Sequence, residues 1–248
     1  MKVVYHPYFT RVYENDPAAE AGRMEPIVKE LSGFDFIKPD SAEPADILLC
    51  HTPSHIGYVQ GYGEVYEMAM LAAGGALKAA EIAVKGEPAF APIRPPGHHA
   101  SPDSCWGFCF FNNIAIAVSK LLDVGQVRSA LILDFDLHFG DGTANIFEAD
   151  KAVIYFHPED GTRQAFVDHV ARFLAENKAD IIAVSAGFDR HIEDWGRLLT
   201  TEDYRTMGQA VRSFAEKNCK GRRFGVLEGG YNHAVLGKNV RAFVEGMA

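Results

Sequence analysis

The sequence has little cysteine, with four residues at positions 50, 105, 109 and 219 of a 248-residue chain. So few and so scattered cysteines exclude the disulfide framework of a small secreted domain. Cys105 and Cys109 have three residues between them and no second pair follows, which excludes a structural zinc site built from four thiolates. We therefore expect buried, reduced thiols.

The sequence also lacks long apolar runs and basic clusters. No uncharged stretch reaches the roughly 20 residues that span a bilayer, and the first residues lack the features of a signal peptide. We expect a cytoplasmic protein with no membrane partner. The formal net charge is −9, and no basic cluster is longer than Arg222-Arg223. Direct binding of nucleic acid is disfavoured, whereas the acidic surface favours a cationic substrate.

The composition is that of a globular protein with a large core, at 48% hydrophobic and 23% charged residues. Without repeats or linkers, residues 1–248 are predicted to form one domain. Strand-like runs are predicted at residues 3–6, 47–51, 89–93, 130–136, 153–157, 181–185 and 224–227. Helical patterns lie between most of them, at residues 64–85, 112–124, 164–177, 201–218 and 233–246. This alternation predicts an α/β fold with a mostly parallel sheet and helices on both faces.

Polar side chains follow three of these strands. Asp134, Asp136 and His138 alternate at the end of one apolar run, and capping of the next helix is the simpler interpretation of the two aspartates. His98 and His99 follow another run on a loop stiffened by two prolines, and Asp189 follows a third. Since ligands bind beyond the carboxyl ends of parallel strands, these residues together indicate an active site.

Asp136, His138 and Asp189 offer two carboxylates and an imidazole, which suit a catalytic zinc ion with an open position for water. Hydrolysis of an amide then needs a base, an acid and a donor to the oxyanion. His98 and His99 can supply the first two, with Asp134 and Asp141 at positions from which they can orient the rings. The residue that best fits the third role is Tyr231, which follows two glycines. On its own, a structural tyrosine would be the simpler interpretation of Tyr231.

Five motifs resemble, in order, those of the zinc-dependent histone deacetylase family. They are RPPGHHA at 94–100, GFCFFNN at 107–113, DFDLHFGDGT at 134–143, AGFD at 186–189 and LEGGYN at 227–232. The last motif is similar to the class II form and to the bacterial acetylpolyamine amidohydrolase and acetoin-utilization branches. The resemblance implies the arginase/deacetylase fold, with an eight-stranded parallel sheet. It also implies removal of acetyl or other acyl groups from amines such as acetyl-lysine or acetylpolyamine.

The resemblance assigns roles to residues as well. It makes Asp136, His138 and Asp189 the zinc ligands, and it makes His98 and His99 a tandem acid/base pair. It implies that Asp134 and Asp141 orient these histidines, and that Tyr231 polarises the carbonyl group. The residues implied to surround the substrate are Gly107, Phe108, Trp195, Gly229 and Gly230.

The family also binds a monovalent cation, usually potassium, through its first motif aspartate and through carbonyl groups of the next two ligands. Asp134, Asp136 and His138 match that part of the site. The remaining ligands normally come from a Ser-Leu-His stretch, where this chain has Tyr155, Phe156 and His157. The resemblance implies a potassium site. Because the serine hydroxyl is absent, the motifs match that site less completely than the zinc site.

The chain is short for the family, with only 31 residues between His157 and Asp189. No glycine-rich loop is evident that would supply a second aromatic wall to the substrate channel. We therefore expect a shallow, open site that admits a protein lysine or a small acylated amine, or that a second copy of the chain completes. Two alternatives stay open: a binuclear manganese ureohydrolase of the same fold, and a catalytically weak protein that binds acyl-lysine.

Overall fold

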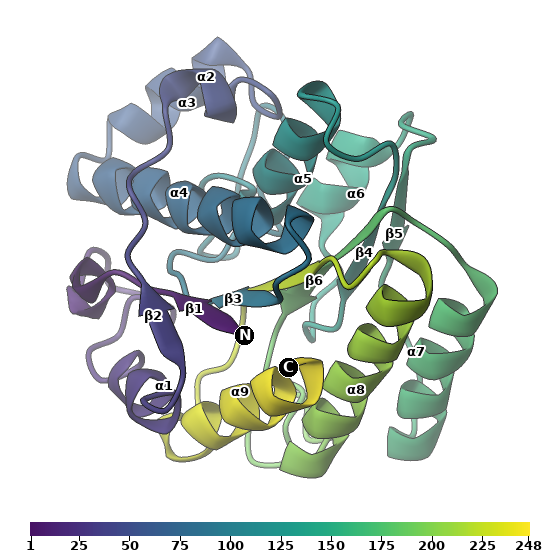
Figure 1. Ribbon diagram of the computed structural model, residues 1–248. Coiled ribbons are helices and arrows are strands. Elements are labelled where there is room, and N and C mark those ends of the chain that lie inside the picture. The colour runs from purple at the N-terminus through teal and green to yellow at the C-terminus, as the bar shows by residue number, and fades with distance from the viewer.

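The computed structural model describes residues 1–248, which fold around a seven-stranded parallel sheet (Figure 1). The strand order is β2-β1-β3-β7-β6-β4-β5, and every neighbouring pair is parallel. The strands are β1 (Lys2–Val4), β2 (Asp35–Ile37), β3 (Ala89–Ala91), β4 (Ala130–Asp134), β5 (Val153–Phe156), β6 (Ile181–Ala186) and β7 (Arg223–Leu227).

Helices cover both faces of the sheet. The helices on one face are α2 (Pro44–Ile47), α3 (Pro53–Gln60), α4 (Glu64–Val84), α5 (Asn113–Asp123) and α6 (Asp141–Phe147). On the other face lie α1 (Glu25–Glu30), α7 (Arg163–Glu176), α8 (Thr201–Asn218) and α9 (His233–Met247). Within these layers α4 packs against α5, and α9 packs against both α8 and α1. The predicted α/β architecture is confirmed.

The core lies at the centre of the sheet. Every residue of β3, β4, β6 and β7 is buried, as expected for parallel strands that are covered on both faces. Phe90 of β3 contacts Phe243 of α9 edge to face, with 6.1 Å between ring centroids. The central strands are therefore rigid supports for the loops that leave their carboxyl ends.

Asparagine and threonine side chains fix where several helices begin. Asn112 caps α5 by accepting a hydrogen bond from the amide of Ala115, and Asn232 caps α9 in the same way through Ala234. Both asparagines directly follow loops that contain predicted site residues. Thr200 and Asp203 form a reciprocal capping box at the start of α8.

Two details of the predicted fold are wrong. The sheet has seven strands, whereas the resemblance implied eight. Residues 47–51, predicted as a strand, form the end of α2 and the turn after it, because Pro44 and a capping box between Glu43 and Asp46 start a helix there. The strand that the sequence did not reveal is β2, whose three residues pair with the edge of β1.

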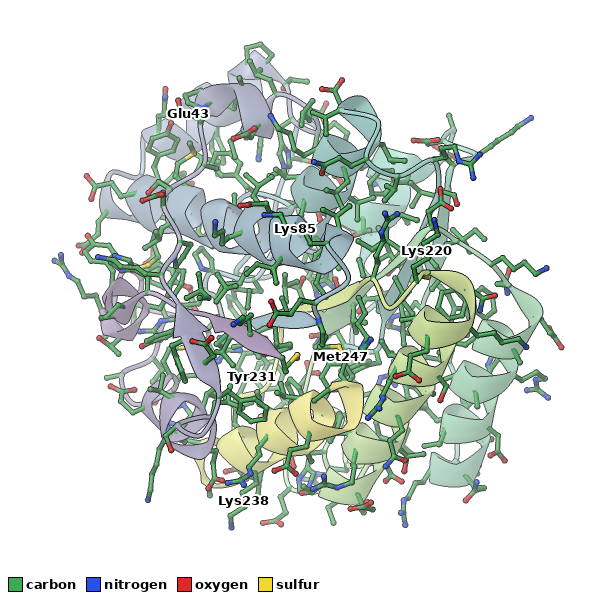
Figure 2. All side chains as sticks on the ribbon, in the orientation of Figure 1. Glu43, Lys85, Lys220, Tyr231, Lys238 and Met247 are labelled. Atoms are coloured by element: carbon green, nitrogen blue, oxygen red, sulfur yellow. The ribbon has the colours of Figure 1, made fainter.

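Both chain ends lie near the amino ends of the strands, opposite the carboxyl ends. Lys2 begins β1, and the carbonyl oxygen of Ala248 accepts a hydrogen bond from Arg223 at the start of β7. Figure 2 labels Lys85 and Lys220, which precede β3 and β7, and Tyr231, which follows β7. The two lysines therefore lie near the amino ends of the strands, and the tyrosine lies near the carboxyl ends. None of the helices combines the length and hydrophobicity needed to cross a membrane.

Candidate active site

The predicted site residues converge at the carboxyl ends of the strands. Asp134 is the last residue of β4, and Asp136 and His138 occupy the turn that follows it. Asp189 follows β6 and Tyr231 follows β7, while the loop after β3 carries the two adjacent histidines. Four neighbouring strands thus deliver the groups to one place.

Asp136, His138 and Asp189 form one cluster, in which the ligand atoms lie within 4.8 Å of one another. The Nδ1 atom of His138 is 3.5 Å from Oδ1 of Asp136 and 3.6 Å from Oδ2 of Asp189. Oδ2 of Asp189 is buried and has no hydrogen-bond partner. An unpartnered carboxylate oxygen that faces two other ligand groups is a natural position for a cation.

The electrostatics of the cluster also favour a bound cation. Burial and the charge of Asp136 raise the pKa of Asp189 to about 6. The two carboxylates raise the pKa of His138 to about 9. Both shifts arise in part from the close negative charges of the two carboxylates, which a divalent metal would neutralise. The residues therefore fit a metal ion.

Two glycines allow the backbone to approach the cluster closely. A Cβ atom at Gly187 would lie 2.1 Å from Oδ2 of Asp136, and one at Gly229 would lie 2.6 Å from Oδ2 of Asp189. The amide of Gly229 instead donates a 2.7 Å hydrogen bond to Asp136. The glycines of the AGFD and LEGGYN motifs are therefore required by the spacing of the carboxylates.

The two histidines each bind one carboxylate. Nδ1 of His98 donates to Oδ2 of Asp134 over 3.0 Å, and Nδ1 of His99 donates to Oδ1 of Asp141 over 2.6 Å. This pairing is the one that the resemblance implied. The Nδ1 atoms carry the protons, so both Nε2 atoms are directed away from the carboxylates that orient the rings.

The environments of the two histidines push their pKa values apart. Burial acts to lower the pKa of His98, but the negative charges of Asp134 and Asp136 outweigh it and raise that pKa well above its usual value. Burial and the neighbouring His98 lower the pKa of His99. The two imidazole rings lie side by side, with 4.1 Å between ring centroids.

Tyr231 is held at the site by contacts that the sequence does not reveal. Its backbone amide donates to Oδ2 of Asp194 over 2.8 Å. Arg23, fully buried, donates to the carbonyl oxygens of Glu228 and Gly230 in the turn before the tyrosine. The Tyr231 ring stacks on Trp195 with centroids 4.0 Å apart. These contacts fix the direction of the phenol.

A cavity of about 140 Å³ opens over the cluster. Its lining residues are Pro96, His98, His99, Trp106, Gly107, Phe108, His138, Trp195, Gly229 and Tyr231. Four of the five residues predicted to surround the substrate are among them. Gly230 is not, because its backbone faces Leu236 and Phe188 and its φ of 122° serves the turn. The backbone conformation of Gly230 allows the turn that precedes Tyr231, and its contact with substrate stays a prediction.

Trp106 is a site residue that the sequence did not reveal, although it directly precedes the GFCFFNN motif. Its indole Nε1 donates to Oδ2 of Asp141 over 2.8 Å, and its ring packs on His99 with centroids 3.9 Å apart. Trp106 thus connects the histidine and the carboxylate that orients it. Its side chain is 55% exposed, so it also forms one rim of the cavity, with the 49% exposed Trp195 as another.

Glu228, in the LEGGYN motif, is another site residue that the sequence did not reveal. It lies close to His98 and Cys109, so these three residues are a second group with the types and spacing of metal ligands. Its carboxylate already accepts hydrogen bonds from the amides of Gly97 and His98 and from the hydroxyl of Ser185. Glu228 therefore connects the histidine loop to β6 and β7. Burial raises its pKa to about 7.

The fold and the site define a class of protein: an α/β amidohydrolase scaffold with a cluster of three residues that could hold a metal ion and a tandem histidine pair. A family model, that of the histone deacetylase domain, matches the chain over residues 18–162 and 158–247. Because that model covers most of the chain, the chain belongs to the histone deacetylase family.

Individual relatives support the same family assignment. A probable deacetylase of Archaeoglobus fulgidus is 34% identical over 79% of this chain and 69% of the relative. A second, from Methanothermobacter thermautotrophicus, is 29% identical over all of this chain and 90% of the relative. A crystal structure of the HDA15 HD domain superposes with a TM-score of 0.85 at 23% identity, covering 98% of this chain and 88% of that chain. The last similarity shows the shared fold.

Proposed function

We propose that the protein is a zinc-dependent amidohydrolase that removes acetyl groups from acylated amines, with residues 1–248 acting as one catalytic domain. One observation carries the proposal. The histidine pair, Tyr231 and His138 line a single cavity, and Asp136 and Asp189 form one cluster of potential metal ligands with His138. Deacetylation needs each of these groups, and membership of the histone deacetylase family supports the same reaction.

Asp136, His138 and Asp189 would hold the metal. The donor set of one imidazole and two carboxylates suits zinc, and three protein ligands leave a position for water and substrate. When bound, zinc lowers the pKa of a water molecule and polarises the scissile carbonyl group. Oδ1 of Asp189 and both oxygens of Asp136 also accept backbone hydrogen bonds, which fix the directions of the two carboxylates.

The histidine pair would move the protons of the reaction. His99 and His98 present their Nε2 atoms away from Asp141 and Asp134, so one ring can accept a proton from the attacking water while the pair returns a proton to the leaving amine. Tyr231 would donate a hydrogen bond to the carbonyl oxygen as negative charge develops there. Burial raises the pKa of Tyr231 well above its usual value, which keeps the phenol protonated.

The size of the cavity favours a small acyl group. Its volume of about 140 Å³ lies below the roughly 300–1,000 Å³ of pockets that enclose drug-sized ligands. An acetyl group and a few methylene groups of an amine fit this volume, and Phe108 with the two indoles supplies an apolar lining. The net charge of −9 favours a cationic remainder, as in acetyl-lysine or an acetylpolyamine.

The test is an activity screen of zinc-reconstituted protein against acetyl-lysine peptides, acetylpolyamines and amines with longer acyl chains. We expect release of acetate from short-chain substrates. The matched control is Tyr231→Phe, which should keep one zinc per chain and lose most of the turnover. Stoichiometric zinc without hydrolysis of any substrate would contradict the proposal, and two manganese ions per chain would favour a ureohydrolase instead.

A further inference from the structure

The side chain of Arg190 occupies the neighbourhood where the family resemblance places a monovalent cation. Arg190 follows Asp189 and is buried, with 7% of its surface exposed. Its Nε atom donates to the carbonyl oxygen of Asp136 over 3.0 Å, and Nη2 lies 3.3 Å from the carbonyl oxygens of Leu137 and Pro158. The carbonyl group of Asp136 is one of those that the resemblance assigned to potassium. A guanidinium group therefore takes up an oxygen that the ion would need.

The side-chain groups at the predicted cation site are also in use. Tyr155, at the position of the missing serine, donates its hydroxyl to Oδ2 of Asp134 over 2.9 Å. His98 donates to the same oxygen, and the amide of Asp136 donates to Oδ1 over 3.1 Å. Both carboxylate oxygens of Asp134 thus already accept hydrogen bonds. The residues present do not fit a monovalent cation.

His157 extends the contact from Arg190 towards Asp134. Nη2 of Arg190 lies 3.1 Å from Nε2 of His157, and because a guanidinium only donates, this Nε2 must accept. Nδ1 of the neutral ring then carries the proton. That atom is buried, has no hydrogen-bond partner, and lies 4.0 Å from Oδ1 of Asp134. An N–H group beside this carboxylate disfavours a cation between them.

The surroundings of Arg190 supply the negative charge that its buried guanidinium needs. Asp189, Asp136 and Asp134 all contribute favourable charge interactions with it. On the opposite side the guanidinium packs over the ring of Phe166 in α7, 4.7 Å from the ring centroid. Burial lowers the pKa of Arg190 overall, and the three carboxylates partly offset the cost of burying its charge.

We propose that Arg190 is a built-in substitute for the monovalent cation, which positions the loop of Asp134 to His138 without a bound ion. A free ion dissociates, whereas a side chain remains at the site at any salt concentration. The protein should then need no potassium, either for stability or for turnover. The claim on turnover rests on the proposed function, and the claim on stability does not.

The first experiment measures thermal melting in about 100 mM potassium chloride and in choline chloride of the same ionic strength. The wild-type protein should melt at the same temperature in both salts, with and without zinc. A melting temperature that rises by several degrees with potassium but not with choline would overturn the proposal, whatever the enzymatic activity.

The second experiment removes the guanidinium group. Arg190→Ala should lower the melting temperature and cut turnover roughly 10–100-fold, the usual effect of losing a group that supports metal ligands. Addition of ethylguanidinium should restore part of both, whereas choline should not. Arg190→Lys keeps the charge and should retain more of both than the alanine variant. A matched control is Arg128→Ala, which removes an exposed arginine paired with Asp180.

The outcomes separate the two proposals. An Arg190→Ala variant that melts and turns over like the wild type would overturn the role of Arg190. If the wild-type protein hydrolyses no acylated amine, the proposed function fails. The melting comparison still decides whether Arg190 replaces the ion, and if the alanine variant does not fold, the lysine variant gives the same comparison.

Discussion

Replacing Asp189 by asparagine should stabilise the metal-free protein, although it removes a metal ligand. Burial and the charge of Asp136 raise the pKa of Asp189 from 3.8 to about 6, so keeping this carboxylate charged in the fold costs about 3 kcal/mol. The raised pKa already includes the attraction to His138, which acts to lower it, so only the amide NH₂ placed at the buried, unpartnered Oδ2 position is subtracted, at a cost of roughly 1 kcal/mol. The expected net gain is about 1–2 kcal/mol.

The size of this effect depends on pH. The unfolded chain ionises Asp189 near pH 3.8 and the folded chain near pH 6, so the penalty is absent below about pH 4 and complete above pH 6. The gain in Asp189→Asn should therefore be large at pH 8 and small at pH 4.5. Urea unfolding with EDTA present measures it directly, as the difference in free energy of unfolding between variant and wild type.

The matched control is Asp136→Asn, which we expect to have the opposite sign. Despite its burial, His98 and His138 hold the pKa of Asp136 below its usual value. Both of its oxygens accept backbone hydrogen bonds, from His138 and Gly229, and an amide NH₂ cannot accept one of them. Asp136→Asn should lose about 1–3 kcal/mol. Loss of stability in Asp189→Asn at pH 8, or equal shifts in the two variants, would refute the reasoning.

Three further outcomes are expected. Trp106→Phe keeps a ring over His99 but loses the hydrogen bond to Asp141, so kcat should fall about threefold to tenfold with the zinc content unchanged; an unchanged kcat would show that the bond is not needed. Glu228→Gln should gain stability relative to the wild type as pH rises through about 7, because burial raises the pKa of this acid; urea unfolding at pH 6 and 8 checks this, and a relative loss at pH 8 would argue against it. Saturating zinc should raise the melting temperature of the wild type and leave that of Asp189→Asn unchanged, and equal shifts in both would mean that the metal binds elsewhere.

The part of the fold that the sequence revealed is the centre of the sheet. The strands at 130–134, 181–186 and 223–227 are fully buried, so they appear as continuous apolar runs, and α8 shows its period of apolar residues from Thr201 to Asn218. The edge strand β2 has three half-exposed or exposed residues and no such pattern. Short edge strands depend on pairing with a neighbouring strand, and the local sequence does not reveal that contact.

Part of the candidate site was likewise predictable from the sequence, and part of it was not. Its ligand groups lie at strand ends within short motifs, so their convergence could be inferred from the rule for parallel sheets. Arg23, Arg190 and Trp106 act through contacts with segments distant in the chain, as when Arg23 donates to the carbonyl oxygen of Gly230. A single sequence gives the residue types but not these pairings.

The positions of the two indoles give the protein an optical property. Trp106 and Trp195 are the only tryptophans in the chain, and both lie at the rim of the cavity. One packs on His99 and the other on Tyr231. Intrinsic tryptophan fluorescence is consequently emitted from the cavity rim alone, with no background from elsewhere in the fold. Emission spectra can therefore follow metal or substrate entering the cavity in the unlabelled, unmodified protein.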